Sequence, residues 1–149
     1  MSSERSREAS SRREEAVNHV LVVEHEVDMA ATYERLLRRA GHRVVTTDSC
    51  AAGLRLLRST RPKLVISDLH LPDGDGLDIP RAAAALEPAP RVIIVFVRAS
   101  RAVRSAARAF GVSAFLSIPF SIADFSNLVE DVLREPGRER IPFVTRGAP

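Results

Sequence analysis

The chain alternates short apolar segments with segments whose apolar residues recur at helical spacing, and this alternation is the strongest constraint on its fold. His19–Val23 is an apolar, largely β-branched run with the length of a buried strand. Apolar residues at spacings of three and four follow, and they predict a helix that ends near Gly41. The alternation continues up to Pro136. It predicts five strand–helix units, and therefore a parallel sheet covered by helices on both faces, an α/β fold.

The later units are predicted in the same way. The remaining strands are expected at Arg43–Thr47, Leu64–Ser67, Val92–Val97 and Ala114–Ser117. A helix is also expected over Leu77–Leu86, where Pro80 is compatible only with the first turn. Ser121 is a good N-cap for the last helix, which Pro136 ends.

The composition describes one globular domain with two polar ends. The chain has 149 residues, 45% of them hydrophobic, which is enough for one core. Residues 1–17 are rich in Ser, Arg and Glu and are expected to be disordered. Residues 18–135 form the expected domain, and residues 136–149 a flexible tail too short for an output domain.

Charge and cysteine content restrict compartment and partners. The formal net charge is only +3, so the chain lacks a strong electrostatic footprint for nucleic acid, and direct binding of nucleic acid is not expected. No apolar stretch is long enough to cross a membrane, so no membrane association is expected. Cys50 is the only cysteine, which excludes an internal disulfide. Together these features favour the cytoplasm. The sequence does not indicate an oligomeric state.

Acidic residues follow two of the predicted strands. Asp68 comes directly after the third strand, and Glu24, His25 and Glu26 follow the first. If these strands are neighbours, their ends lie about 5 Å apart, and Glu24 and Asp68 could share a cation such as Mg²⁺. A solvated turn is an equally good interpretation of the segment 24–26. The loop Asp73–Asp78 is best explained as a tight turn, in which Gly74 and Gly76 are expected to supply unusual backbone angles.

Three segments resemble the receiver domain of two-component response regulators: Val20–His25, Leu64–Leu77 with its Ser-Asp-Leu-His-Leu-Pro-Asp-Gly core, and Phe115–Phe120 with its closing Ile-Pro-Phe. The resemblance covers His19–Glu135. It implies a flavodoxin-like, doubly wound (βα)5 fold with strand order 2-1-3-4-5. Receivers are not conventional enzymes. They take a phosphoryl group from a histidine kinase onto an aspartate, use Mg²⁺, and then change the surface of the fourth helix, fifth strand and fifth helix.

The resemblance assigns roles around the aspartate unevenly. Asp68 matches the phosphoacceptor, and Glu24 matches the first metal-holding acid with a longer side chain. His70 stands where the family offers a main-chain carbonyl to the metal. His25 stands where a second acid normally holds the metal, and an imidazole suits transition metals better than Mg²⁺.

Two further family positions have lost their polar groups. Phe96 replaces the Ser or Thr that bonds the phosphoryl group, and Ile118 replaces the lysine that is its counter-ion. Lys63, the only lysine, begins the third strand and cannot substitute. Arg98 is the nearest replacement cation. Phe115 matches the aromatic residue that reports activation by turning inward, and Phe96 is expected to alter or abolish the coupling between these two positions. The Ile118–Pro119 peptide matches one that is commonly cis in the family, and we expect it to be cis.

The fourth predicted helix carries a basic face. Arg101, Arg104 and Arg108 recur at spacings of three and four, opposite its apolar stripe, and Arg98 could extend the patch. A solvated face is the simpler interpretation. The resemblance favours a surface for a histidine kinase or another signalling protein.

Three functions are compatible with these residues. The favoured one is a stand-alone atypical receiver that acts mainly by protein–protein contact, with weak or no phosphorylation and at most weak Mg²⁺ binding. The alternative is a conventional Mg²⁺-dependent phosphoacceptor modified on Asp68. The third is a metal- or ligand-binding module that uses Glu24, His25 and His70.

Overall fold

The computed structural model describes residues 19–135. The predictions of a disordered segment at residues 1–17 and of a flexible tail at residues 136–149 lie outside the described residues. Within 19–135, strands and helices alternate in the predicted order.

The sheet has five parallel strands in the order β2-β1-β3-β4-β5, which confirms the predicted fold class and topology. Three strand boundaries differ from the prediction by one residue: the end of β3 and both ends of β4. Asp68 still pairs with β4, so it belongs to β3, whereas Val97 has left the sheet and is 62% exposed. The strands are β1 His19–Val23, β2 Arg43–Thr47, β3 Leu64–Asp68, β4 Arg91–Phe96 and β5 Ala114–Ser117.

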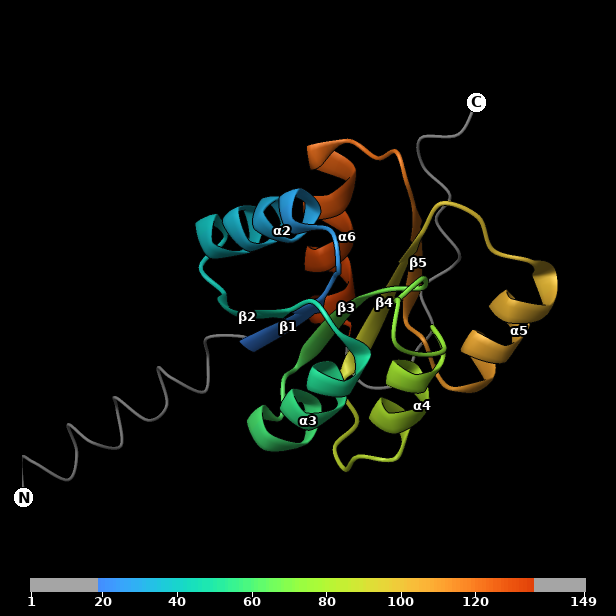
Figure 1. Ribbon diagram of the computed structural model, residues 1–149. Coiled ribbons are helices and arrows are strands. Elements are labelled where there is room, and N and C mark those ends of the chain that lie inside the picture. Colours follow the sequence, from blue (N-terminus) through green and yellow to red (C-terminus); the bar gives the residue numbers. More distant parts are fainter. Residues whose placement is uncertain (1–18, 136–149) are drawn as a thin grey trace, which may run out of the picture.

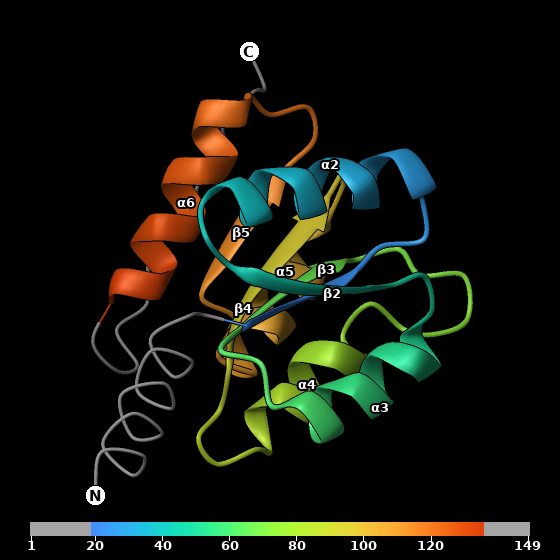
Figure 2. The ribbon, with the colours of Figure 1, turned by 90° about the vertical axis from the view of Figure 1, so that its left-hand side faces the viewer.

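Helices cover both faces of the sheet: α2 and α6 lie on one face, and α3, α4 and α5 on the other (Figures 1 and 2). Pro80 lies in the first turn of α4, as predicted, and the Ser121 side chain caps α6 by accepting from the Asp124 N–H. Each helix between residues 19 and 135 falls short of the length and apolar content that a bilayer span needs. The helices are α2 Val27–Arg39, α3 Cys50–Thr60, α4 Asp78–Ala84, α5 Arg101–Ala109 and α6 Ile122–Arg134.

The core consists of two apolar layers separated by the sheet. Successive residues of a strand point to opposite faces, so Val20 and Val22 pack under α2 and α6, while Leu21 and Val23 pack under α3, α4 and α5. The other strands follow the same alternation. The central strands β1, β3 and β4 are buried on both faces and almost wholly apolar, with polar side chains only at their ends, whereas the edge strand β2 is partly exposed and more polar.

Gly76 is required by close approach and not by its backbone angles. A Cβ at Gly76 would lie 1.8 Å from the Leu69 carbonyl oxygen, and one at Gly74 would lie 2.7 Å from the Cys50 Sγ. Neither residue has a positive φ, so the expectation of unusual backbone angles there is wrong. The positive φ values among the described glycines belong to Gly41 and Gly111, which follow the C-cap residues of α2 and α5.

Gly76→Ala should destabilise the domain by about 3 kcal/mol, because the new methyl group overlaps a backbone oxygen that cannot move without shifting β3. Gly111→Ala is the matched control. Its Cβ meets nothing within 4 Å, so the change costs only the backbone strain of a φ of 80°, about 1 kcal/mol. Urea unfolding of both variants measures the difference. Equal midpoints would contradict the close-approach explanation.

Candidate functional site

The order of the strands places Glu24 beside Asp68. β1 lies between β2 and β3. The chain therefore adds β2 on one side of β1 and then adds β3, β4 and β5 on the other side, so the order of the strands reverses between β1 and β3. Ligands of open α/β sheets bind beyond the strand ends at such a reversal. Val23 pairs with Ser67, and therefore the next residues, Glu24 and Asp68, emerge side by side at the carboxyl edge.

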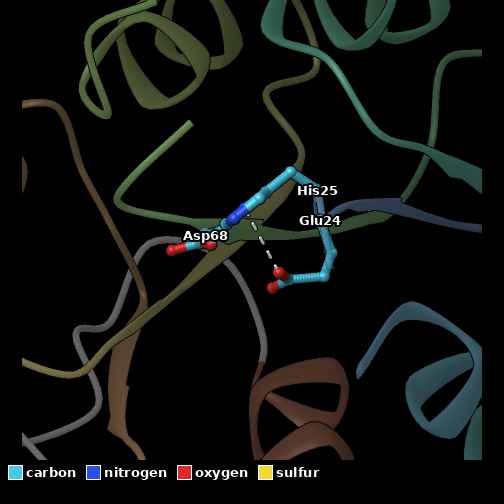
Figure 3. A group of neighbouring side chains, drawn as sticks. All are labelled: Glu24, His25 and Asp68. Atoms are coloured by element: carbon cyan, nitrogen blue, oxygen red, sulfur yellow. Dashed lines mark ion pairs between the residues drawn. The ribbon is translucent and has the colours of Figure 1, made fainter. Parts of the chain in front are cut away.

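Three side chains converge at this edge (Figure 3). The His25 Nδ1 atom lies 3.2 Å from the Asp68 Oδ2 atom and 3.6 Å from the Glu24 Oε1 atom. One donor atom from each of the three residues lies within 4.8 Å of the others. The interpretation of segment 24–26 as a solvated turn is therefore wrong for Glu24, which is buried, whereas His25 is exposed and also faces Asp68.

Backbone groups hold the two carboxylates in place. The Glu24 side chain is 4% exposed and accepts a hydrogen bond from the Glu26 N–H at 3.1 Å. The Asp68 side chain is 13% exposed and accepts from the His70 N–H at 2.9 Å through Oδ1. Oδ2 of Asp68 remains directed towards His25. The His25 side chain is 45% exposed and forms the solvent side of the cluster.

Burial changes the acidity of this cluster. It raises the pKa of Glu24 from 4.5 to about 7, and the neighbouring charge of Asp68 adds to the increase. Burial first, and then the charges of Glu24 and Asp68, also raise the pKa of Tyr33. The Tyr33 hydroxyl is buried without a hydrogen-bond partner in the described region. Negative charge on the inner side of the site, at Glu24 and Tyr33, is thus poorly solvated.

The ring of His70 does not belong to the cluster. Its Nε2 atom lies 3.2 Å from the Arg98 carbonyl oxygen, so the side chain links the β3–α4 loop to the residues after β4. The His70 ring therefore does not support the alternative of a metal- or ligand-binding module that uses Glu24, His25 and His70. The role of its main-chain carbonyl as a metal ligand stays a prediction.

Phe96 and Ile118 lie on opposite sides of the sheet. Phe96 is 5% exposed and packs in the layer under α3, α4 and α5, where its ring meets that of Phe115 edge to face at a centroid distance of 6.1 Å. Phe115 is 3% exposed and so is turned inward. Ile118 is half-buried and packs against the layer under α2 and α6. The Ile118–Pro119 peptide is cis, as predicted.

Within residues 19–135, neither Lys63 nor Arg98 forms an ion pair with Asp68. Lys63 directly precedes β3, and five strand steps of about 3.3 Å put it about 16 Å from Asp68 at the opposite edge. Arg98 is exposed and makes no ion pair with Asp68 in the described part of the chain. Among the described residues, the cationic group that does approach Asp68 is His25, when it is protonated.

The acidic β3–α4 loop is structural, as its interpretation as a tight turn predicts. Asp73 accepts hydrogen bonds from the N–H groups of Cys50 and Ala51 at 2.7 and 3.1 Å, and so ties the loop to the start of α3. Asp78 accepts from the Asp75 N–H at 3.1 Å. The link between Asp73 and α3 spans more than 20 residues, and no local pattern in the sequence signals it.

The arginines of the fourth predicted helix lie on and just before α5. Arg98, Arg101 and Arg108 are exposed, and Arg104 is half-buried. Ala107 of the same helix is fully buried in the layer under α3, α4 and α5. The basic face therefore points away from the core.

Comparison with known proteins identifies relatives of this chain. The transcriptional regulatory protein PrrA of Mycobacterium leprae is 33% identical over 118 residues, which cover 79% of this chain and 51% of PrrA. The KDP operon transcriptional regulatory protein KdpE of Escherichia coli is 30% identical over 126 residues, which cover 85% of this chain and 56% of KdpE. The chain thus spans about half the length of these curated relatives.

The fold has many solved counterparts. The response regulator receiver domain protein (CheY-like) from Methanospirillum hungatei superposes with a TM-score of 0.75 at 21% identity, covering 78% of this chain and 94% of that one. At this identity the likeness concerns the fold alone. The family model of the response regulator receiver domain matches residues 20–130, most of the chain. The chain therefore belongs to the response regulator receiver domain family of two-component signal transduction.

Proposed function

We propose that this receiver is atypical and acts mainly by protein–protein contact, with weak or no phosphorylation of Asp68. Receiver domains are signalling modules and not enzymes, apart from phosphoryl transfer to an aspartate. The observation that carries the proposal is the edge-to-face contact of Phe96 with an inward Phe115. These two rings stand at the two positions through which receiver domains couple phosphorylation to a change of their surface. Because both rings are buried, the inward state of Phe115 does not depend on a phosphoryl group.

The lost polar groups also support weak phosphorylation. Ile118 packs against apolar side chains where a lysine would oppose the phosphoryl charge. A charge-assisted hydrogen bond contributes about 1.5–3 kcal/mol, and each 1.4 kcal/mol, roughly, is a factor of ten. The absence of that bond and of the hydroxyl at Phe96 would together lower phosphorylation by several powers of ten.

The donor set at the strand ends does not fit Mg²⁺. Mg²⁺ takes octahedral oxygen ligands, whereas the third group here is the His25 Nδ1 atom, 3.2 Å from Asp68 Oδ2. This nitrogen donor weakens the hold on a hard cation, which supports at most weak Mg²⁺ binding.

The partner surface in this proposal is the face of α5, β5 and α6. Arg101 and Arg108 are exposed there, and Arg98 extends the basic patch towards the strand ends. An acidic surface on a histidine kinase or another signalling protein would complement this charge. Relatives such as PrrA and KdpE are named as transcriptional regulators, and the region of those proteins outside the match lies beyond this proposal.

Beryllofluoride with Mg²⁺, a mimic of the phosphorylated state, should leave the NMR spectrum of this chain almost unchanged. The triple variant His25→Asp, Phe96→Thr, Ile118→Lys should instead show saturable shifts around Asp68, because it regains the metal acid, the hydroxyl and the counter-ion. Its Phe115 resonances should respond as well. The expected gain in apparent affinity is at least about a hundredfold.

Asp68→Asn in the triple variant is the control, and it should abolish the response. Saturable shifts centred on Asp68 in the unmodified chain at millimolar beryllofluoride would overturn the proposal and favour the conventional phosphoacceptor. A comparable affinity of the unmodified and triple-variant chains would do the same.

Glu24 should make the domain lose stability as the pH rises. Its folded pKa of about 7 exceeds the ordinary 4.5, so the folded state binds the proton more tightly. The associated stabilisation is complete below pH 4.5 and disappears as the pH rises through 7. Relative to Glu24→Gln, the unmodified chain should lose about 3 kcal/mol of unfolding free energy over this interval.

Urea unfolding of both proteins between pH 4 and 8, in a chelator, measures this difference. His25 is present in both proteins, so its own titration contributes to both curves. Parallel curves for the two proteins would show that Glu24 titrates normally in the folded state and would contradict the prediction.

A further inference from the structure

The site that does not fit Mg²⁺ has the donors of a transition-metal site. We infer that Glu24, His25 and Asp68 form a site for one borderline divalent cation of the zinc class. The inference goes beyond the proposed function and is independent of it, because a receiver with weak phosphorylation needs no bound metal. It rests on the spacing, the orientation and the chemistry of the three donor atoms.

The spacing fits one shared ion. Zinc lies about 2.0–2.2 Å from nitrogen and oxygen ligands, so two ligands of one tetrahedral or octahedral ion lie about 3.0–3.5 Å apart. The His25 Nδ1 atom is 3.2 Å from Asp68 Oδ2 and 3.6 Å from Glu24 Oε1. Figure 3 shows the three side chains turned towards one another from two neighbouring strand ends. All three donor atoms lie within 4.8 Å of one another, so a movement of the Glu24 and Asp68 side chains towards each other would place all three on one ion.

The carboxylates are already oriented for this role. The Glu26 N–H holds the buried Glu24 carboxylate, and the His70 N–H holds Asp68 through Oδ1 and leaves Oδ2 directed towards His25. Such outer hydrogen bonds fix metal ligands and strengthen binding. His25 is 45% exposed and also lines an open pocket of about 450 Å³, so an ion can reach the site from solvent.

The chemistry of the donors selects the class of ion. One imidazole nitrogen with two carboxylates is a set that zinc and its neighbours in the first transition row accept, and zinc sites with three protein ligands keep a position for water. Ca²⁺ and Mg²⁺ prefer oxygen ligands only. A bound ion would engage Asp68 Oδ2 directly. Metal occupancy would then compete with phosphorylation for the same carboxylate.

Titration of the full chain with Zn²⁺ by calorimetry, and with Co²⁺ by visible absorption, tests the inference. We expect one ion per chain with micromolar or tighter affinity for Zn²⁺, and d–d bands of Co²⁺ without a thiolate charge-transfer band. His25→Ala should weaken Zn²⁺ binding at least about tenfold to a hundredfold. His25→Asp should do the same while increasing affinity for Mg²⁺.

His70→Ala is the matched control, because the His70 ring contacts the Arg98 carbonyl and not the other donors. It should keep the affinity for Zn²⁺. Far-UV circular dichroism and urea midpoints verify that the variants are folded, and the His25 ring ¹⁵N shifts of the unmodified chain report ligation without any mutation. Four results would each overturn the inference. Two concern binding: no saturable binding of Zn²⁺, or equal Zn²⁺ affinities of the unmodified chain and His25→Ala. Two are spectroscopic: a Co²⁺ charge-transfer band from the Cys50 thiolate, or His25 ring shifts that do not change on adding Zn²⁺.

Discussion

The pairing of β1 with β3 is the interaction on which the site depends. The Val23–Ser67 register brings Glu24 and His25 to the side of Asp68, although these residues are more than 40 positions apart in the chain. The register is in turn maintained by burial of both faces. A shift of one residue would move every side chain of a strand to the opposite layer, and the two layers are lined by different helices. The packing of the core therefore fixes the relative position of Glu24 and Asp68.

Phe96 and Ile118 both add apolar surface to the core near the strand ends, and in the proposed function they do so in place of groups that serve phosphoryl transfer. Phe96 adds a buried aromatic ring to the layer under α5, where the edge-to-face contact with Phe115 is favourable beyond the area that it buries. Ile118 adds apolar surface to the opposite layer. The proposal that the receiver acts through its surface rests on these two apolar residues. If the Phe96–Phe115 pair does not move, the face of α5, β5 and α6 keeps one conformation for its partner.

Two acidic residues of the segments that follow β1 and β3, Glu24 and Asp73, have different physical roles. Asp73 is bonded to two backbone N–H groups at the start of α3, and these bonds lower its pKa. Glu24 is buried next to Asp68, and its pKa is raised. The first carboxylate holds the loop in place, whereas the second is in an environment that favours a proton or a cation. The distinction comes from hydrogen-bond partners and burial, which residue type alone does not specify.

The sequence by itself determined the elements and their order. Apolar periodicity is a local property, so the five strands and five helices between residues 19 and 135 and the parallel sheet could be predicted to within one or two residues, together with the Ser121 cap of α6. The position of Asp68 at a strand end follows from the same pattern. Tertiary structure alone decided which side chains meet there. His25 turns towards Asp68, His70 turns away to Arg98, and Gly76 is required by the Leu69 carbonyl. These contacts depend on the register and packing of segments distant in sequence, which no local periodicity encodes.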